Sequence, residues 1–163
     1  MIIYICNKRI GDYWMGRLNT SKILCRAFHY GQTDRGGTEY YKHPYTVAKL
    51  CKHRNAKIVA YMHDLIEDTT CTIELIKDLG YSKKIINALT AVTHDKSMNY
   101  PEYLKIVKHN KIATEVKIAD MIHNADISRI PNPTEEDCNR SLRYLKYIDY
   151  LQNRCSYEEI KQI

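Results

Sequence analysis

"IVAYMHDLIED", residues 58–68, places one histidine and three carboxylates within six positions of an otherwise apolar segment. Wound as an α-helix at about 100° per residue, the segment separates into an apolar face and a polar face. The polar face carries His63, Asp64, Glu67 and Asp68. Carboxylates this close repel one another unless they are solvated, protonated or neutralised by a cation. The pattern therefore predicts an amphipathic helix whose polar face is either a solvated acidic surface or half of a metal site.

The rest of the chain shows the same helical periodicity from Asn19 onward, with capping residues and no alternation typical of a β-strand. We expect an all-α fold, a compact single-domain helical bundle over residues 19–163, preceded by residues 1–18 of uncertain structure. The Gly36-Gly37 pair indicates a loop, Ser82 begins one helix and Gly80 ends another. A last helix is expected over residues 135–151, after Pro131 and Pro133.

Composition limits the classes of function. A chain of 163 residues with a formal net charge of +6 fits one domain that binds anionic ligands such as nucleotides, although ordinary solubility explains the charge equally well. No block of like charges indicates a nucleic-acid-binding arm, and no segment reaches the roughly 20 apolar residues that span a membrane. Six cysteines without ligand spacing and the absence of a signal peptide favour free thiols in the cytoplasm.

A metal site on the 58–68 helix needs ligands from elsewhere, and two segments offer them. His43 precedes Pro44 at a loop-to-helix junction, where the restricted backbone holds a side chain in one direction. In "VKIADMIHNAD", residues 116–126, Asp120 shares one helical stripe with Lys117 and Asn124, whereas Ile122 is expected to face the core. Taken singly, a histidine before proline is usually structural and one aspartate is usually a cap or a paired charge.

Taken together, His … His-Asp … Asp on three helical segments resembles the HD phosphohydrolase superfamily. The segments "AFHYGQTDRGGTEYYKHPYTVA" (27–48), "HDLIEDT" (63–69) and "VKIADMIHNADISR" (116–129) resemble the hydrolase domain of the RelA/SpoT alarmone family. More narrowly, they are similar to its small stand-alone hydrolases, and the resemblance runs from about residue 21 to residue 151. It identifies residues 19–163 as an HD hydrolase domain.

The resemblance implies a reaction and a set of residues for it. It implies one Mn²⁺ held by His43, His63, Asp64 and Asp120, with Glu67 and Asp68 handling the attacking water. The expected reaction removes the 3′-pyrophosphate from ppGpp or pppGpp and leaves GDP or GTP. Histidine and carboxylate ligands also suit Fe²⁺, Zn²⁺ or Co²⁺.

The resemblance further implies nucleotide contacts by Asn124, Arg35 and Lys117, with a solvated Lys117 as the open alternative. His123 points away from the Asp120 stripe, so we expect it to support the site or the core. The chain departs from the larger bifunctional enzymes at Asp34, where they carry an arginine, and at Ile127, where they carry a hydroxyl. Both departures concern nucleotide recognition and leave the metal set intact.

Two other functions stay open. One is an HD phosphohydrolase for another nucleotide, such as a nucleoside phosphate or the 2′-phosphate of NADPH. The other is a non-catalytic nucleotide sensor or antitoxin-like module, whose hallmark would be loss of the metal or water-handling residues. The tyrosine-rich helix with Tyr144, Tyr147 and Tyr150 is compatible with a homo-oligomer as well as with a monomer.

Overall fold

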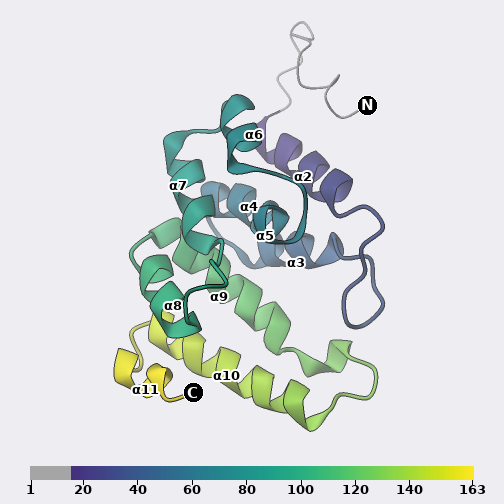
Figure 1. Ribbon diagram of the computed structural model, residues 1–163. Helices are drawn as coiled ribbons and strands as arrows, with labels where there is room; N and C mark the ends of the chain where they lie inside the picture. The colour runs from purple at the N-terminus through teal and green to yellow at the C-terminus, as the bar shows by residue number, and fades with distance from the viewer. Residues whose placement is uncertain (1–15) are drawn as a thin grey trace, which may run out of the picture.

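The computed structural model describes residues 16–163, which fold as an all-α bundle (Figure 1). The only β geometry in this part of the chain is an isolated bridge between Thr33 and Glu39. The prediction of an all-α fold is therefore confirmed for the described residues, whereas residues 1–15 of the N-terminal segment lie outside them. The helices are α2 (Arg17–Phe28), α3 (Lys42–Leu50), α4 (Arg54–Ala60), α5 (Leu65–Asp68), α6 (Ile73–Asp78), α7 (Lys83–Val92), α8 (Tyr100–Lys108), α9 (Lys111–Ala125), the 3₁₀ turn η1 (Ile127–Arg129), α10 (Glu135–Leu151) and α11 (Tyr157–Lys161).

Local capping explains where several helices begin and end. Thr134 and Asp137 form a reciprocal capping box that starts α10 at the expected residue, Glu135. Gly80 follows α6 with φ of +74°, a backbone conformation that glycine adopts without strain. A second capping box, built on Ser156, begins α11, so α10 is not the last helix as we had expected.

The prediction of a single helix over residues 58–68 is wrong. The segment forms two helices, α4 and α5, separated by a turn in which Met62 N bonds Val59 O at 2.9 Å. The His63 side chain contacts the carbonyl of Ala60 at 2.8 Å, the group that a continuous helix would pair with the amide of residue 64. The break turns His63 into the protein, where it is only 3% exposed.

Helix α9 lies in the middle of the molecule and packs against α3, α4, α7, α8 and α10 (Figure 1). Its Ala113, Val116 and Met121 are buried in one continuous core. Ile122 is 46% exposed, so the prediction that it faces the core is wrong. Because α9 is surrounded by other helices, a polar side chain on it can meet partners from several distant segments.

Two sequence-level expectations concern the compartment. The five cysteines within residues 16–163 are all free thiols. Over the same residues we find no helix whose length and apolar character would let it cross a membrane.

Candidate active site

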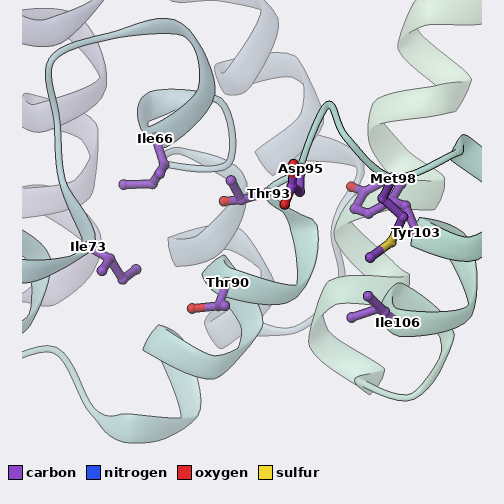
Figure 2. Close-up of a pocket in the computed structure, with 8 residues that line it drawn as sticks. All are labelled: Ile66, Ile73, Thr90, Thr93, Asp95, Met98, Tyr103 and Ile106. Carbon is purple, nitrogen blue, oxygen red and sulfur yellow. The ribbon is translucent and has the colours of Figure 1, made fainter.

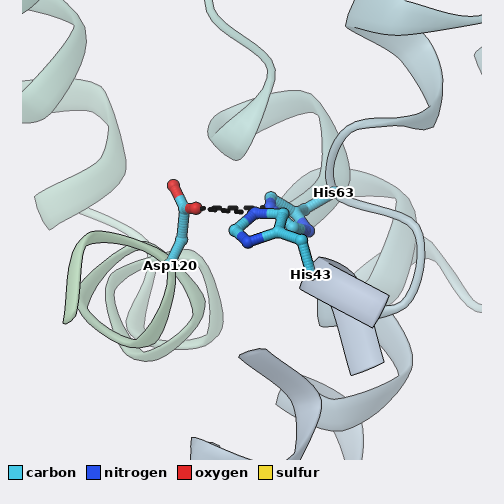
Figure 3. Close-up of side chains that lie close together, drawn as sticks. All are labelled: His43, His63 and Asp120. Atoms are coloured by element: carbon cyan, nitrogen blue, oxygen red, sulfur yellow. Dashed lines mark ion pairs between the residues drawn. The ribbon is translucent and has the colours of Figure 1, made fainter. Parts of the chain in front are cut away.

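His43 from α3, His63 from the turn between α4 and α5, and Asp120 from α9 converge inside the bundle (Figure 3). Each offers one ligand atom, and these atoms all lie within 4.8 Å of one another. Asp120 Oδ1 lies 3.1 Å from His43 Nε2 and 3.6 Å from His63 Nε2. All three residues are buried, and together they could hold a metal ion.

The state of His63 indicates that a cation fits this site. Its Nδ1 lies 2.8 Å from the carbonyl oxygen of Ala60 and must donate to it, which leaves Nε2 without a proton in the neutral ring. Nε2 is buried and has no hydrogen-bond partner among the described residues, although Asp64 Oδ1 is 3.1 Å away. An orphaned imidazole nitrogen surrounded by carboxylate oxygens is the donor set that a divalent transition metal prefers.

The excess of negative charge is visible in the pKa of His63. Burial acts to lower this pKa, but Asp64 and Asp120 outweigh burial and raise it to about 9. The carboxylates around this imidazole therefore attract positive charge, which is what a cation site requires.

The side chain of Asp64 lies beside this group of three residues and is more exposed than theirs. Its Oδ2 is 3.5 Å from His43 Nε2 and accepts a hydrogen bond from Tyr40 Oη at 2.8 Å. The same phenol is 3.4 Å from Asp68 Oδ2. Tyr40 thus connects the expected fourth ligand with one of the two expected water-handling carboxylates. Both roles stay predictions.

Glu67 and Asp68 stand in different surroundings. Glu67 Oε1 accepts a hydrogen bond from the His94 amide at 2.8 Å, whereas Asp68 is exposed. Burial raises the pKa of Glu67 and outweighs the hydrogen bond from His94, which lowers it. A carboxylate with a raised pKa is a stronger base than an ordinary carboxylate, which suits Glu67 to accept a proton.

Lys117 is not a solvated lysine. Its Nζ lies 2.9 Å from Asp120 Oδ2, and its side chain is 13% exposed. The rings of Tyr100 and Tyr103 lie within 5.8 Å and 5.5 Å of the ammonium group. The side chain therefore balances the charge of a candidate metal ligand, and its expected contact with a phosphate stays a prediction.

A polar pocket of about 250 Å³ opens beside His43. The guanidinium groups of Arg35, Arg129 and Arg140 line it. Asn124 connects the pocket with the metal group, because it lines the pocket and its Nδ2 donates to Asp120 Oδ1 at 2.7 Å. The remaining lining residues are Thr33, Asp34, Gly36, Tyr40, His43, Asp126, Ile130 and Tyr144. Cations beside a candidate metal group are what a phosphorylated ligand requires.

A larger hollow of about 380 Å³ lies elsewhere, against α5, α6, α7 and α8 (Figure 2). Its lining is mostly apolar, and its one charged side chain is Asp95. The lining residues are Ile66, Ile73, Thr90, Thr93, Asp95, Met98, Tyr103 and Ile106. A hollow with a carboxylate and no cation does not suit a phosphate group, so the smaller polar pocket is the candidate ligand site.

Several known proteins are similar to this chain in sequence or in fold. No protein-family model matches the sequence. A Synechocystis protein named "Probable guanosine-3′,5′-bis(diphosphate) 3′-pyrophosphohydrolase" is 30% identical over 123 residues, 63% of this chain and 16% of that protein. Proteins named guanosine-3′,5′-bis(diphosphate) 3′-pyrophosphohydrolase MESH1 are each 31% identical, over 53% of this chain in Xenopus tropicalis and 59% in Danio rerio. These matches span 54% and 59% of the two vertebrate proteins, so the chain covers less than two thirds of each relative.

The fold is compared with a solved structure described as "A metazoan ortholog of SpoT hydrolyzes ppGpp and plays a role in starvation responses". The TM-score is 0.70 at 20% identity, over 93% of this chain and 97% of the solved one. This chain resembles the SpoT-type ppGpp hydrolases in sequence and in fold. The resemblance inferred from the three sequence segments is confirmed.

Within this SpoT-like fold, some residues that contact the site were not foreseen. Tyr40 and Arg129 carried no sequence signal, because Asp64 and Asp34, the residues they contact, lie far from them in sequence. Arg140 pairs with the nearby Asp137, but only the tertiary structure places it in the pocket lining. His123 was expected to support the site, and it contacts His43. The departure at Asp34 does not place a free acid in the pocket: Oδ1 accepts from the amides of Gly36 and Thr38, and Oδ2 accepts from Arg129.

Proposed function

We propose that the chain is a metal-dependent phosphohydrolase that removes the 3′-pyrophosphate from ppGpp or pppGpp, giving GDP or GTP and pyrophosphate. The observation that carries the proposal is the convergence of His43, His63 and Asp120, with the orphaned His63 Nε2 at its centre. The names of the sequence relatives and of the similar structure support the choice of substrate.

We assign the metal to His43, His63, Asp120 and Asp64, and we propose Mn²⁺ because imidazole and carboxylate ligands suit it. A bound divalent ion would lower the pKa of water and neutralise charge on a phosphate oxygen. His63 and His43 supply neutral nitrogen ligands, and Tyr40 keeps Asp64 turned toward them.

Glu67 is the proposed base that takes the proton from the attacking water. The His94 amide engages Oε1, so we assign the proton to Oε2. Burial raises the pKa of Glu67 and so increases its basicity. Asp68 is exposed beside it and is proposed to orient the water.

The polar pocket is proposed to hold the rest of the nucleotide. Arg35 is exposed at its rim and pairs with Asp137 at 2.7 Å, so it can exchange that carboxylate for a phosphate oxygen. Asn124 lines the pocket and donates from Nδ2 to Asp120 Oδ1. Lys117 favours phosphate binding through its charge.

A second candidate substrate is another phosphorylated nucleotide, such as a nucleoside phosphate or NADPH. The observation that favours it is the ion pair between Asp34 and Arg129 in the pocket lining, because Asp34 stands where the larger bifunctional enzymes are expected to carry an arginine.

One experiment tests both candidates. Purified protein is incubated with Mn²⁺ and, separately, with ppGpp, pppGpp, GTP and NADPH, and the products are separated by anion-exchange chromatography. We expect pyrophosphate and GDP from ppGpp, with loss of turnover after chelation or in Glu67→Gln. Turnover of another nucleotide with none of ppGpp would contradict the first candidate and support the second.

A further inference from the structure

The two candidate metal-binding histidines are held in different ways. His63 Nδ1 is fixed by a backbone carbonyl, that of Ala60. His43 Nδ1 instead lies 2.7 Å from Nδ1 of another side chain, His123 on α9. The orientation and proton of His43 therefore depend on a residue that can be replaced without altering the backbone.

The two imidazole rings face each other edge to edge. Their planes are inclined by 28° and their centroids are 4.9 Å apart, a separation that the 2.7 Å contact and the two ring radii account for. A contact this short between two ring nitrogens requires one proton between them, and only one of the nitrogens can donate it.

Arg129 decides which nitrogen donates. Its Nη1 lies 3.0 Å from His123 Nδ1 and donates to the His123 carbonyl at 2.7 Å. A guanidinium group has donors only, so the positive Nη1 beside His123 Nδ1 disfavours a proton there and leaves that nitrogen as the acceptor in the contact with His43. The shared proton then belongs to His43 Nδ1, and His43 Nε2, 3.1 Å from Asp120 Oδ1, carries a free lone pair.

Arg129 is itself held in place by the loop on the other side of the pocket. Its Nη2 donates to Asp34 Oδ2 at 2.8 Å, and Asp34 Oδ1 accepts from the amides of Gly36 and Thr38, each at 2.9 Å. A continuous line of contacts thus runs from Asp34 through Arg129 and His123 to His43.

We propose that His123 is a positioning residue for the metal: it keeps the proton of His43 on Nδ1, so that Nε2 faces the ion, while Arg129 and Asp34 keep His123 an acceptor. A ligating histidine whose other nitrogen donates to a fixed acceptor has a defined tautomer and ring orientation. The inference rests on the proposed metal site and is independent of the identity of the nucleotide.

Metal binding is the direct test, with Zn²⁺ alone as a diamagnetic probe and titration calorimetry as the measurement. In His123→Leu the acceptor is lost while a side chain of similar bulk is kept, and we expect affinity to fall by about 10–100-fold. In His123→Asn an amide oxygen takes the place of Nδ1 as acceptor, and we expect affinity close to that of the wild type. Rescue by asparagine separates the acceptor role from simple packing.

Nitrogen chemical shifts of the histidine rings give a second readout. In the Zn²⁺-bound wild-type protein we expect His43 to show a protonated Nδ1 and a metal-bound Nε2. A His43 bound through Nδ1 would overturn the inference, and so would a folded His123→Leu variant with wild-type affinity. If the wild-type protein binds no metal, both the proposed metal site and this inference are wrong. If the wild-type protein binds metal and the His123 variants bind it with the same affinity, only this inference is wrong.

Discussion

Lys117 and Asp120 stand one turn apart on α9 and form a buried ion pair of 2.9 Å, while the other oxygen of Asp120 faces His43 and His63. One carboxylate therefore balances a buried ammonium group and also belongs to the candidate metal group. Burial acts to lower the pKa of Lys117, but Asp120 outweighs it and the pKa lies well above its usual value.

Replacing Lys117 by methionine should destabilise the metal-free protein, because Asp120 would keep a buried charge without its cation. Breaking a buried pair in this way lowers the free energy of unfolding by about 3–5 kcal/mol. Chemical unfolding of variant and wild type in the presence of a chelator measures this loss. Added Mn²⁺ should restore part of the loss. Lys77→Met is the matched control, since Lys77 pairs with Glu74 at the same helical spacing on the surface. Equal losses in both variants would contradict the assignment.

Tyr40→Phe should weaken catalysis without unfolding the protein. The phenol donates to Asp64 Oδ2 at 2.8 Å, and a hydrogen bond to a charged group contributes about 1.5–3 kcal/mol. If the bond positions Asp64, kcat/KM should fall by roughly tenfold or more. Tyr41→Phe removes a hydroxyl that binds exposed Glu39 and serves as the control. A Tyr40→Phe variant with the kcat/KM of the wild type would show that the hydrogen bond from Tyr40 does not position Asp64 for catalysis.

Glu67→Gln should abolish activity and yet stabilise the metal-free protein at neutral pH. Burial raises the folded-state pKa of Glu67 above its ordinary value of 4.5. The folded state therefore favours the protonated acid. The stabilising contribution of Glu67 to folding is fully present below pH 4.5 and is lost as the pH rises through the folded pKa. In urea unfolding measured at a series of pH values, the free energy of unfolding of Glu67→Gln should exceed that of the wild type by an amount that grows as the pH rises. Glu74→Gln, the same substitution at an exposed position, is the matched control.

Glu115→Ala should destabilise the fold but spare the site. Glu115 on α9 accepts hydrogen bonds from the amides of Lys52 and His53, between α3 and α4, at 2.5 and 2.9 Å. Loss of such charge-assisted bonds costs about 1–3 kcal/mol. We expect a lower free energy of unfolding with an unchanged metal affinity, and a large loss of metal affinity would contradict this separation.

The same carboxylate gives a pH dependence of stability. Burial acts to raise the pKa of Glu115, but the bonds from His53 and Lys52 outweigh it and the pKa lies below 4.5. Its stabilising contribution is therefore present above pH 4.5 and is lost as the pH falls through the folded pKa. Wild type and Glu115→Ala should converge in stability under acid.

Local sequence signals predicted much of the secondary structure. Pro131 and Pro133 before α10 and the glycine at position 80 after α6 act close to their own helices, so α10 and the end of α6 lie where the pattern placed them. The helix over residues 58–68 could not be predicted correctly, because the side chain of His63 competes for the carbonyl of Ala60 inside the folded bundle. Ile122 fits the apolar period of α9, but it stays 46% exposed among the described residues 16–163.

The sequence by itself determined the kinds of chemical group available: two histidines and several carboxylates on separate helical segments, in an order typical of HD phosphohydrolases. Only the tertiary structure decided how those groups are used. Packing around α9 brings His43, His63 and Asp120 within 4.8 Å, buries Lys117 against Asp120, and places Arg129 between Asp34 and His123. These contacts join residues that are distant in sequence, and no local pattern encodes them because each depends on how whole helices pack together.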